Sequence, residues 1–453
     1  MLKIGLEIHG YLDTKEKLFC TCKIEHNAMP NTNICPVCTG QPGSKPMLPN
    51  KEAIQKVVQV ALMLNSKINT LNNKKMLVWQ RKHYNWPDLP KGYQNTLSGT
   101  YAIPVAENGN FLGIKIREMH LEEDPAAWDP ETGCVDYNRS GAPLIEIVTE
   151  PDFTSAEQVK NWLKRFMLIM GYIKALNKTA GIKADVNVNI KGISTRTEVK
   201  NVNSISEIIK VIEYEEKRHL KEKPKFQETR RWNSEKQISE SMREKESHAD
   251  YRFISDPDLP AIKIKKEDVE LLKKRLPETP DEKLAKLIKK YKINKTNAEV
   301  LSSNLEIVEF FEEIAEKIPP EFALPWVTIE LLRVLNYNKK TLDEVKILPE
   351  HFIELLNLVK HGKITELKAK QILNNFIPES FSLLKEEKES SKLSEKETEE
   401  IVKKAIKENF KAVQDYKSGK LESFNFLMGE VMKLSNKRAD YKSASEILRR
   451  LIK

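Results

Sequence analysis

The chain has 453 residues, of which 40% are hydrophobic and 31% are charged. Its length predicts two or three globular domains, and its apolar fraction is too high for a disordered chain. No apolar run approaches the roughly 18 residues that a membrane span requires, and the first residues enter a strand pattern directly, which leaves no room for a signal peptide. These features exclude a membrane protein and predict a cytoplasmic one.

The net charge of +9 is unevenly distributed along the chain. Residues 401–453 contain 13 Lys and Arg against 6 Asp and Glu, a balance of +7, so the first 400 residues carry only +2. A local surplus of this kind indicates a polyanionic partner at the C-terminal end, most simply a nucleic acid. The alternative at this point is a lysine-rich composition without a partner.

The first part of the chain, residues 1–265, has the pattern of mixed strands and turns. Strands are predicted at 3–9, 144–148 and 185–190, because apolar residues alternate there or form short continuous runs. Helices are predicted near 52–64 and 155–170, the second with Ser155 as its N-cap.

From Lys266 onwards the pattern becomes helical, with segments at 269–275, 297–315 and 351–359. We predict a helical domain over 266–384, then a charged linker at 385–392 that opens a small helical tail domain over 385–453. In the tail, Phe424, Leu427, Met428 and Val431 have the spacing of a buried helix face. The predicted fold class is therefore α+β, a sheet domain followed by two helical parts.

Four of the five cysteines form two close pairs, Cys20 with Cys22 and Cys35 with Cys38. Two such pairs on tight turns can present four thiolates in the tetrahedral arrangement that Zn²⁺ prefers. Clustered cysteines fit metal binding in a reducing compartment better than a disulfide framework. We predict a structural zinc site; free cysteines or an iron–sulfur cluster are the alternatives. Cys134 is expected to be an ordinary buried residue.

Polar and acidic side chains interrupt three predicted strands. Glu7 and His9 share one face of the first strand, His120, Glu122 and Asp124 alternate along a second, and Glu146 stands alone in a third. Any one of these alone is more simply a surface residue or an ion-pair partner. Together, and with the polar face of Asp185 and Asn187, they predict a site for Mg²⁺ or Mn²⁺, which prefer oxygen ligands. Such a site commonly serves a nucleotide phosphate.

No phosphate-binding glycine loop of the usual kinds is present, so bound ATP would lie on the sheet between cationic side chains. No Ser-x-Lys, Cys-His or Gly-x-Ser-x-Gly nucleophile arrangement is present either, so we do not expect the chain to hydrolyse an amide. The candidate ATP-binding cations are Arg81, Lys82, Arg139, Arg230 and Arg252.

Nine segments together resemble one family, the B subunits of aspartyl/glutamyl-tRNA amidotransferases. The resemblance runs from end to end of the chain. The segments are Gly5–His9, Tyr84–Tyr93, His120–Asp124, Asn138–Val148, Lys200–Ser204, Glu228–Arg231, Asp250–Phe253, Asp415–Lys420 and Phe426–Lys433.

The resemblance implies a β-sheet cradle related to the glutamine synthetase core, a helical domain and a tail that contacts tRNA. It implies an ATP-dependent ligase that phosphorylates the side-chain carboxylate of mischarged Glu-tRNA(Gln) or Asp-tRNA(Asn). Ammonia from a partner amidase, the A subunit of a complex that also holds a small C subunit, then forms the amide. The implied magnesium ligands are Glu7, His9, Glu122, Glu123 and Glu146, with Asp185 and Asn187 lining the site.

Two alternatives remain open at this point. One is the archaeal Glu-specific relative of the B subunit, which carries a large inserted domain for which 453 residues leave no space. The other is a non-catalytic zinc-ribbon protein that binds RNA, which would explain the cysteines and the basic tail but not the acidic strands.

Overall fold

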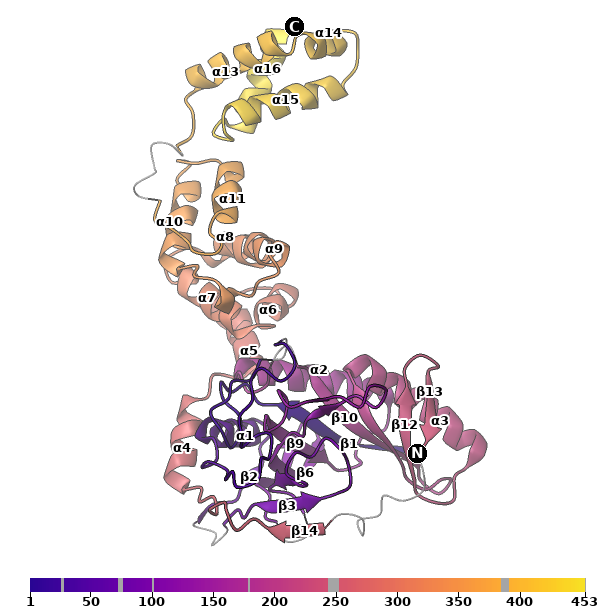
Figure 1. Cartoon of the computed structure of the whole chain (residues 1–453). Coiled ribbons are helices and arrows are strands. Elements are labelled where there is room, and N and C mark those ends of the chain that lie inside the picture. The colour runs from indigo at the N-terminus through magenta and orange to yellow at the C-terminus, as the bar shows by residue number, and fades with distance from the viewer. Residues whose placement is uncertain are drawn as a thin grey trace. The chain divides into compact units, whose positions relative to one another are not determined.

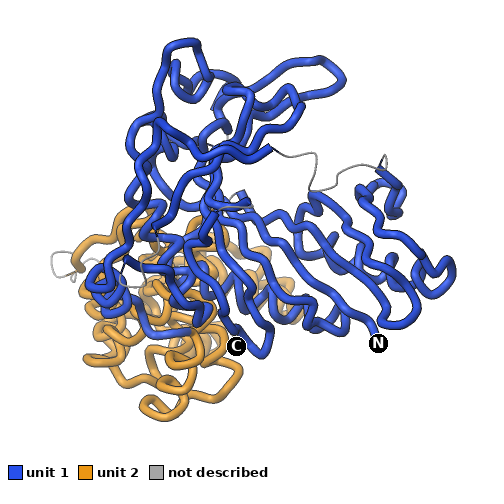
Figure 2. Tube along the Cα trace, turned by 90° about the horizontal axis from the view of Figure 1, so that it is seen from below, with its two compact units in different colours: residues 1–279 blue, residues 280–453 orange. Residues whose placement is uncertain are grey.

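The computed structural model describes residues 1–25, 28–71, 76–99, 102–177, 180–242, 252–383 and 391–452. The chain forms two compact units, residues 1–279 and residues 280–453 (Figures 1 and 2). The first contains a large sheet with helices and the second is helical, which confirms the predicted α+β class. In these ranges no helix combines the length and hydrophobicity needed to cross a bilayer.

The first unit is built on a sheet of 12 strands in which most neighbours are antiparallel. A separate two-stranded ribbon joins β7 to β8. The strands are β1 (Leu2–Tyr11), β2 (Lys67–Ile68), β3 (Gln80–His83), β4 (Gln94–Thr96), β5 (Ala106–Phe111), β6 (Ile114–Glu123), β7 (Ala127–Trp128), β8 (Val135–Asp136), β9 (Pro143–Thr149), β10 (Ile182–Ile190), β11 (Thr197–Asn203), β12 (Glu228–Asn233), β13 (Ile238–Ser241) and β14 (Arg252–Ser255).

The centre of the sheet has the strand order β11-β10-β1-β9-β6. β1 pairs with β10 on one side and with β9 on the other, so the N-terminal strand lies between segments far along the chain. The predicted strands at 3–9, 144–148 and 185–190 are confirmed as parts of β1, β9 and β10. One face of each is apolar and buried, as with Ile4 and Ile8 of β1. The other face is therefore left for polar side chains.

Helices α1 (Lys51–Met63), α2 (Ala156–Tyr172) and α3 (Ile205–Glu222) cover the apolar face of the sheet (Figure 1). α2 begins where the sequence predicts, because the Ser155 side chain accepts a hydrogen bond from the backbone N–H of Gln158 at 3.2 Å. Trp162 of α2 is buried and stacks on Phe166 with ring centroids 5.5 Å apart. Because the helices cover the apolar face, the opposite face of the sheet is the one left open.

Helix α4 (Lys266–Arg275) was expected in the second domain but packs against α1 in the first unit. Its apolar residue Val269 completes the core of the sheet unit. The compact units therefore separate after Thr279, later in the chain than the predicted boundary at 265. Periodicity identified the helix, but it could not show which core the helix joins.

A buried ionic cluster ties α3 to the edge of the sheet. The Glu215 carboxylate contacts Arg218 at 2.8 Å and His219 at 3.3 Å, and all three side chains are almost completely buried. Burial alone would raise the pKa of Glu215, but its hydrogen bonds to His219, Arg218 and Ser239 hold that pKa below its ordinary value. Arg218 also donates to the Thr197 hydroxyl of β11 at 2.9 Å. The cluster thus anchors β11 to helix α3.

The second unit consists of short helices, and the predicted helix over 297–315 is two helices with a break at Ser302–Asn304. Asn304 causes the break by capping the second helix through the backbone N–H of Ile307. The elements are α5 (Pro280–Tyr291), α6 (Lys295–Leu301), α7 (Leu305–Ala315), α8 (Pro320–Pro325), the π-helical turn η3 (Trp326–Leu331), α9 (Leu332–Tyr337), the 3₁₀ turn η4 (Leu342–Glu344), α10 (Pro349–Lys360), α11 (Glu366–Asn374), α13 (Glu395–Glu408), α14 (Phe410–Lys417), α15 (Glu422–Leu434) and α16 (Tyr441–Ile452).

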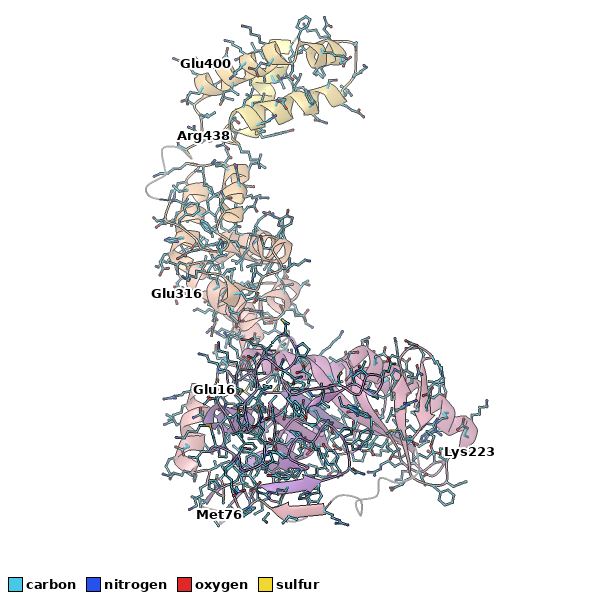
Figure 3. All side chains as sticks on the ribbon, viewed as in Figure 1. Glu16, Met76, Lys223, Glu316, Glu400 and Arg438 are labelled. Atoms are coloured by element: carbon cyan, nitrogen blue, oxygen red, sulfur yellow. The ribbon has the colours of Figure 1, made fainter. Side chains whose placement is uncertain are left out.

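The last four helices have an apolar cluster of their own. It contains the whole predicted stripe, Phe424, Leu427, Met428 and Val431, on α15. The segment before α13 is joined to the turn after α15, because Leu393 donates its N–H to the Arg438 carbonyl at 3.1 Å (Arg438 is labelled in Figure 3). Most of the predicted linker, residues 385–390, lies outside the described residues.

Candidate functional site

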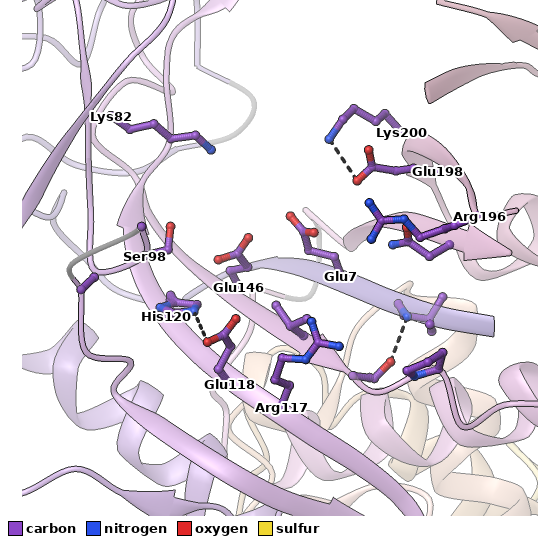
Figure 4. A pocket seen from close by; sticks show the side chains of 18 of the residues that line it. Glu7, Lys82, Ser98, Arg117, Glu118, His120, Glu146, Arg196, Glu198 and Lys200 are labelled. Atoms are coloured by element: carbon purple, nitrogen blue, oxygen red, sulfur yellow. Dashed lines mark hydrogen bonds and ion pairs between the residues drawn. The ribbon is translucent and has the colours of Figure 1, made fainter. Parts of the chain in front are cut away.

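The face of the sheet opposite the helices carries a group of acidic and histidine side chains. The antiparallel register places His9 of β1 directly opposite Glu146 of β9, and Glu146 directly opposite His120 of β6. Two residues before His9, Glu7 lies opposite Asp185 of β10. Residues two apart on a strand share a face, so all these side chains project to the same side. Figure 4 shows Glu7 and Glu146 rising from neighbouring strands into a common pocket.

His9 is at the centre of this group, which we call the carboxylate cluster: Glu7, His9, Glu122 and Glu146. The His9 Nε2 atom is 3.8 Å from a Glu7 oxygen, 3.8 Å from a Glu122 oxygen and 3.7 Å from a Glu146 oxygen. The side chains are 5–28% exposed, so the cluster is mostly buried but reachable from solvent. The four residues come from three strands, and the sequence predicted all four.

The charges of the cluster perturb one another strongly. Burial opposes protonation of His9, yet its contacts with Glu146 and the charges of Glu122 and Glu7 raise its pKa to about 10. Burial and the nearby Glu146 and Asp185 raise the pKa of Glu7 well above its ordinary value. Burial also raises the pKa of Glu122, with Glu146 adding to the effect. Negative charge is thus concentrated beyond what one imidazolium offsets, as in sites that bind a cation.

Glu123 does not join the cluster. It lies on the same side of β6 as the core residue Leu121, because consecutive side chains of a strand point to opposite faces. Its carboxylate contacts the Lys91 ammonium and accepts the backbone N–H of Asn95 at 2.9 Å. The geometry therefore separates Glu123 from the other expected magnesium ligands.

A second acidic group adjoins the first and shares Glu7 with it. Oxygen atoms of Glu7, Asp185 and Glu198 lie within 4.8 Å of one another. Lys200 bridges two of them, with its ammonium 3.0 Å from Asp185 and 3.4 Å from Glu198. Asn187 lies beside them, and its side-chain oxygen is buried without a hydrogen-bond partner among the described residues. An unpaired buried oxygen next to carboxylates is a ready ligand.

Two pockets meet at the carboxylate cluster and share Glu7, Lys82, Glu146 and Lys200. The larger has a volume of about 690 Å³, and we call it the Arg117 pocket (Figure 4). The smaller has a volume of about 490 Å³, and we call it the Trp86 pocket. Besides the shared residues, the first is lined by Arg117, His120, Asn187, Arg196, Glu198 and Phe253, and the second by Tyr84, Trp86, Asp88, Trp128, Arg139 and Lys183.

The predicted cations have different positions. Lys82 lines both pockets, and Arg139 lines the Trp86 pocket. Arg81 is instead held by Asp256 at 2.9 Å and stacks 4.5 Å from the centre of the Tyr93 ring. Arg230 is bound to Ser239 at 2.7 Å, and Arg252 is exposed at the edge strand β14. Neither these two arginines nor Arg81 lines either pocket. Asp250 and Tyr251 of the predicted motif lie outside the described residues.

Three cationic side chains of the site were missed by the sequence analysis. Arg117, Arg196 and Lys200 all line the Arg117 pocket. In Figure 4, Arg196 and Lys200 come from the same side of the pocket and Lys82 from the opposite side. Nothing in the sequence marks Arg117, which precedes an acidic strand segment, or Arg196, which lies just before β11. Lys200 belongs to a segment that resembles the family, but the resemblance implied no role for it. Only the register of the strands shows that they converge.

The four paired cysteines come together as predicted. The sulfur atoms of Cys20, Cys22, Cys35 and Cys38 all lie within 4.8 Å of one another, and we call this group the cysteine centre. A hydrogen bond with Cys20, helped by the charge of Lys17 and opposed by burial, lowers the pKa of Cys38 to about 4. Four convergent sulfur atoms are the donor set that suits Zn²⁺. The prediction that Cys134 is buried is wrong, because it lies exposed beside the β7–β8 ribbon.

The comparison with known proteins agrees with this arrangement. A family model described as the GatB/GatE catalytic domain matches residues 2–270, and one described as the GatB domain matches residues 309–452. Curated relatives, each named as the B subunit of aspartyl/glutamyl-tRNA(Asn/Gln) amidotransferase, match over the whole length of the chain. They come from Methanothermobacter thermautotrophicus, 43% identical over 100% of both chains, and Methanocaldococcus jannaschii, 42% identical over 99% of this chain and 97% of the relative. A third, from Methanopyrus kandleri, is 42% identical over 99% of this chain and 98% of the relative. The chain therefore belongs to the family of aspartyl/glutamyl-tRNA(Asn/Gln) amidotransferase B subunits.

Proposed function

We propose that this chain is the subunit that makes the amide in a tRNA-dependent amidotransferase. It uses ATP to phosphorylate the side-chain carboxylate of glutamate on tRNA(Gln) or of aspartate on tRNA(Asn), and ammonia then displaces the phosphate. The observation that carries the proposal is the carboxylate cluster between two pockets, within residues that match a catalytic-domain model. Two pockets that meet at one reactive centre suit a transfer between two bound substrates.

The carboxylate cluster fits Mg²⁺, or Mn²⁺, as a resident ion. Ligand atoms of Glu7, His9 and Glu146 lie within 4.8 Å of one another, and Glu122 is at their edge. Carboxylate oxygens with one imidazole suit either ion. When bound, such an ion offsets charge on the transferred phosphoryl group. The side chains of the cluster would hold the ion, and their partial burial limits the access of water to the labile acyl phosphate.

The Arg117 pocket suits the nucleotide. Arg117, Arg196 and Lys200 supply positive charge on its walls, and Phe253 supplies an aromatic ring at its edge. Guanidinium groups bind phosphate oxygens in pairs, and an aromatic ring can stack on a base. Lys82, which lines both pockets, is placed to hold the phosphoryl group as it passes from one to the other.

The Trp86 pocket suits the aminoacyl end of the tRNA. Trp86 and Trp128 meet edge to face with ring centroids 5.7 Å apart, and Trp86 is 48% exposed. Exposed aromatic rings are stacking surfaces for an unpaired terminal base. Deeper in the pocket, Asp88 has a buried oxygen with no hydrogen-bond partner in the described ranges, and Arg139 lies nearby. One carboxylate and one guanidinium match the ammonium and carboxylate of an acidic amino acid.

Other parts of the chain take supporting roles in this proposal. The sheet unit acts as a cradle of the glutamine synthetase kind, and zinc in the cysteine centre is structural. The basic tail, whose surplus of Lys and Arg lies in residues 401–453, contacts the tRNA backbone. No amidase nucleophile occurs in the sequence, so ammonia comes from a partner amidase, the A subunit, in a cytoplasmic complex with a small C subunit. The helical region divides functionally near residue 384 into a connecting domain and the tail. Full-length matches to B subunits, without a large insert, favour this over the Glu-specific relative.

The direct test omits every partner. The purified chain is incubated with Glu-tRNA(Gln) or Asp-tRNA(Asn), Mg·ATP and ammonium chloride, and the amino acid on the tRNA is identified after hydrolysis. We expect ATP-dependent formation of the amide, loss of it in Glu146→Gln, and full activity in Glu240→Gln. Glu240 is a suitable control because it pairs with Arg231 on β12, outside both pockets. Amide formation without ATP, or equal activity in all three proteins, would overturn the proposal.

A further inference from the structure

Lys17 is a lysine whose side chain is almost completely buried, with only 1% exposed. Its ammonium group donates to the Cys38 sulfur at 3.3 Å and to the backbone carbonyl of Tyr137 at 3.1 Å. The stem of the side chain packs beside Gly141, where an added Cβ would be 3.6 Å from the Lys17 Cδ atom. Lys17 therefore joins the cysteine centre to the segment Tyr137–Gly141 from inside the protein.

The same segment is attached to the cysteine-bearing loop at further points. The Ser140 hydroxyl donates to the Cys38 carbonyl at 2.7 Å, and the Tyr137 N–H donates to the Asn31 side chain at 2.8 Å. The Leu18 N–H donates to the Gly141 carbonyl at 2.8 Å. These contacts join residues more than one hundred positions apart in the sequence. They therefore depend on the shape of the loop that carries the four cysteines.

Arg139 lies in the middle of this segment, and its side chain leaves toward the Trp86 pocket. There its guanidinium contacts Asp124 at 3.0 Å and donates to the carbonyls of Pro125, at 3.0 Å, and Ala126. Asp124 also accepts the Tyr11 hydroxyl at 2.7 Å. The position of this guanidinium in the pocket is thus set by a backbone segment that Lys17 holds at Tyr137 and that the Ser140 hydroxyl ties to the Cys38 carbonyl.

Electrostatics links the ammonium to the state of the cysteine centre. Four thiolates around a divalent zinc ion leave two net negative charges, and a buried ammonium offsets part of that charge. A buried ammonium without such a partner is costly, because it cannot be hydrated. The contact between Lys17 and Cys38 is therefore strongest when the centre is loaded.

We propose that Lys17 is a positioning residue that couples the cysteine centre to Arg139 in the Trp86 pocket. A loaded centre holds Lys17, Lys17 holds the Tyr137 carbonyl, and the segment then places the Arg139 guanidinium for the acidic acceptor. This inference rests on the proposed function in one respect, the assignment of the acceptor to the Trp86 pocket.

The experiment measures two quantities in the full-length chain. Zinc release to a colorimetric chelator is followed with and without a non-hydrolysable 3′-amide analogue of glutamyl-adenosine, and Michaelis constants are measured for the mischarged tRNA and for ATP. Lys17→Met removes the ammonium group while keeping an unbranched side chain that is one atom shorter. Ser140→Ala removes a second link of the same coupling with a smaller change, and it decides the question if Lys17→Met does not fold.

We expect Lys17→Met to release zinc about 10- to 100-fold faster and to raise the KM for tRNA by a similar factor, the range found when a group that orients a ligand is removed. The KM for ATP and kcat should stay within about twofold, since the Arg117 pocket is untouched. The analogue should slow zinc release in the wild type and not in the variant, because coupling between two sites is reciprocal.

An unchanged KM for tRNA in folded variants, or an analogue without effect on zinc release from the wild type, would overturn the coupling. Failure of the proposed function would look different: no amide would form in any protein, yet zinc release would still report the contact between Lys17 and Cys38.

Discussion

Glu146→Gln and Glu123→Gln should have different effects on the binding of a divalent ion to the carboxylate cluster. Both residues were expected to be ligands, but only Glu146 faces His9, at 3.7 Å. Glu123 points to the other face of β6 and is paired with Lys91. We expect the first substitution to weaken binding of the divalent ion strongly and the second to leave that binding unchanged.

The size of the effect follows from the geometry. One unit of negative charge about 4 Å from a divalent ion is worth roughly 8 kcal/mol at the effective dielectric constant near 20 that suits such sites. About half of this is recovered, since the glutamine oxygen still coordinates and the loss of the Glu146 charge lowers the pKa of His9, which makes its proton easier to displace. The remaining ~4 kcal/mol corresponds to about a thousandfold weaker binding.

The assay is calorimetric titration of the full chain with Mn²⁺, repeated with Mg²⁺ in the presence of a non-hydrolysable ATP analogue. Thermal unfolding of both variants serves as the folding control, because Glu123→Gln leaves the buried Lys91 without its carboxylate. Glu146 is not a ligand of the ion if Glu146→Gln binds it within about threefold of the wild type, or if Glu123→Gln weakens binding as much as Glu146→Gln does.

Three further predictions concern other parts of the chain. Cys35→Ser should lower the zinc content from one ion per chain towards none and reduce the melting temperature, since metal-binding energy is folding energy; metal analysis showing full zinc content would contradict this. The pKa of Glu215 is lowered on folding, so its charge stabilises the protein above its ordinary pKa and this stabilisation is lost as the pH falls through the lowered value. Glu215→Gln should thus reduce the free energy of unfolding in urea at pH 7 more than at pH 3. Equal reductions at the two pH values would contradict a stabilising charge on Glu215. Lys411→Gln with Lys442→Gln, both exposed on the tail, should reduce the salt dependence of tRNA binding by a slope of about 2, and an unchanged slope would remove the tail from the interface.

Local patterns were sufficient for much of the fold. Alternation identified β1 and β10 and placed Glu7 and His9 on one face, because a strand has a strict period of two residues. The N-cap at Ser155 and the stripe on α15 were equally readable, since both depend on residues a few positions apart. The carboxylate cluster itself could be proposed because an acidic residue in an apolar strand is unusual.

What could not be predicted depends on contacts between distant segments. Alternation along the strand separates Glu122 from Glu123, and only the register of β6 against β9 shows that the face of Glu122 is the one that also carries Glu146. Arg81 resembles a phosphate-binding residue in the sequence, and only the structure shows that Asp256 holds it. Arg196 gives no signal because its turn joins the site only through the pairing of β11 with β10. The sequence does not single out Lys17 as the buried partner of Cys38 either, because the chain is rich in lysine.

In the proposed reaction, one chain holds both the nucleotide and the acceptor around the carboxylate cluster. The most direct measurement is positional isotope transfer: the chain alone is given Mg·ATP and tRNA carrying glutamate labelled with ¹⁸O in its side-chain carboxylate, together with free ammonia. We expect one labelled oxygen in the released phosphate for each amide formed, and no labelled phosphate from Glu146→Gln. Amide formation with unlabelled phosphate would contradict it, because the carboxylate would not have been phosphorylated.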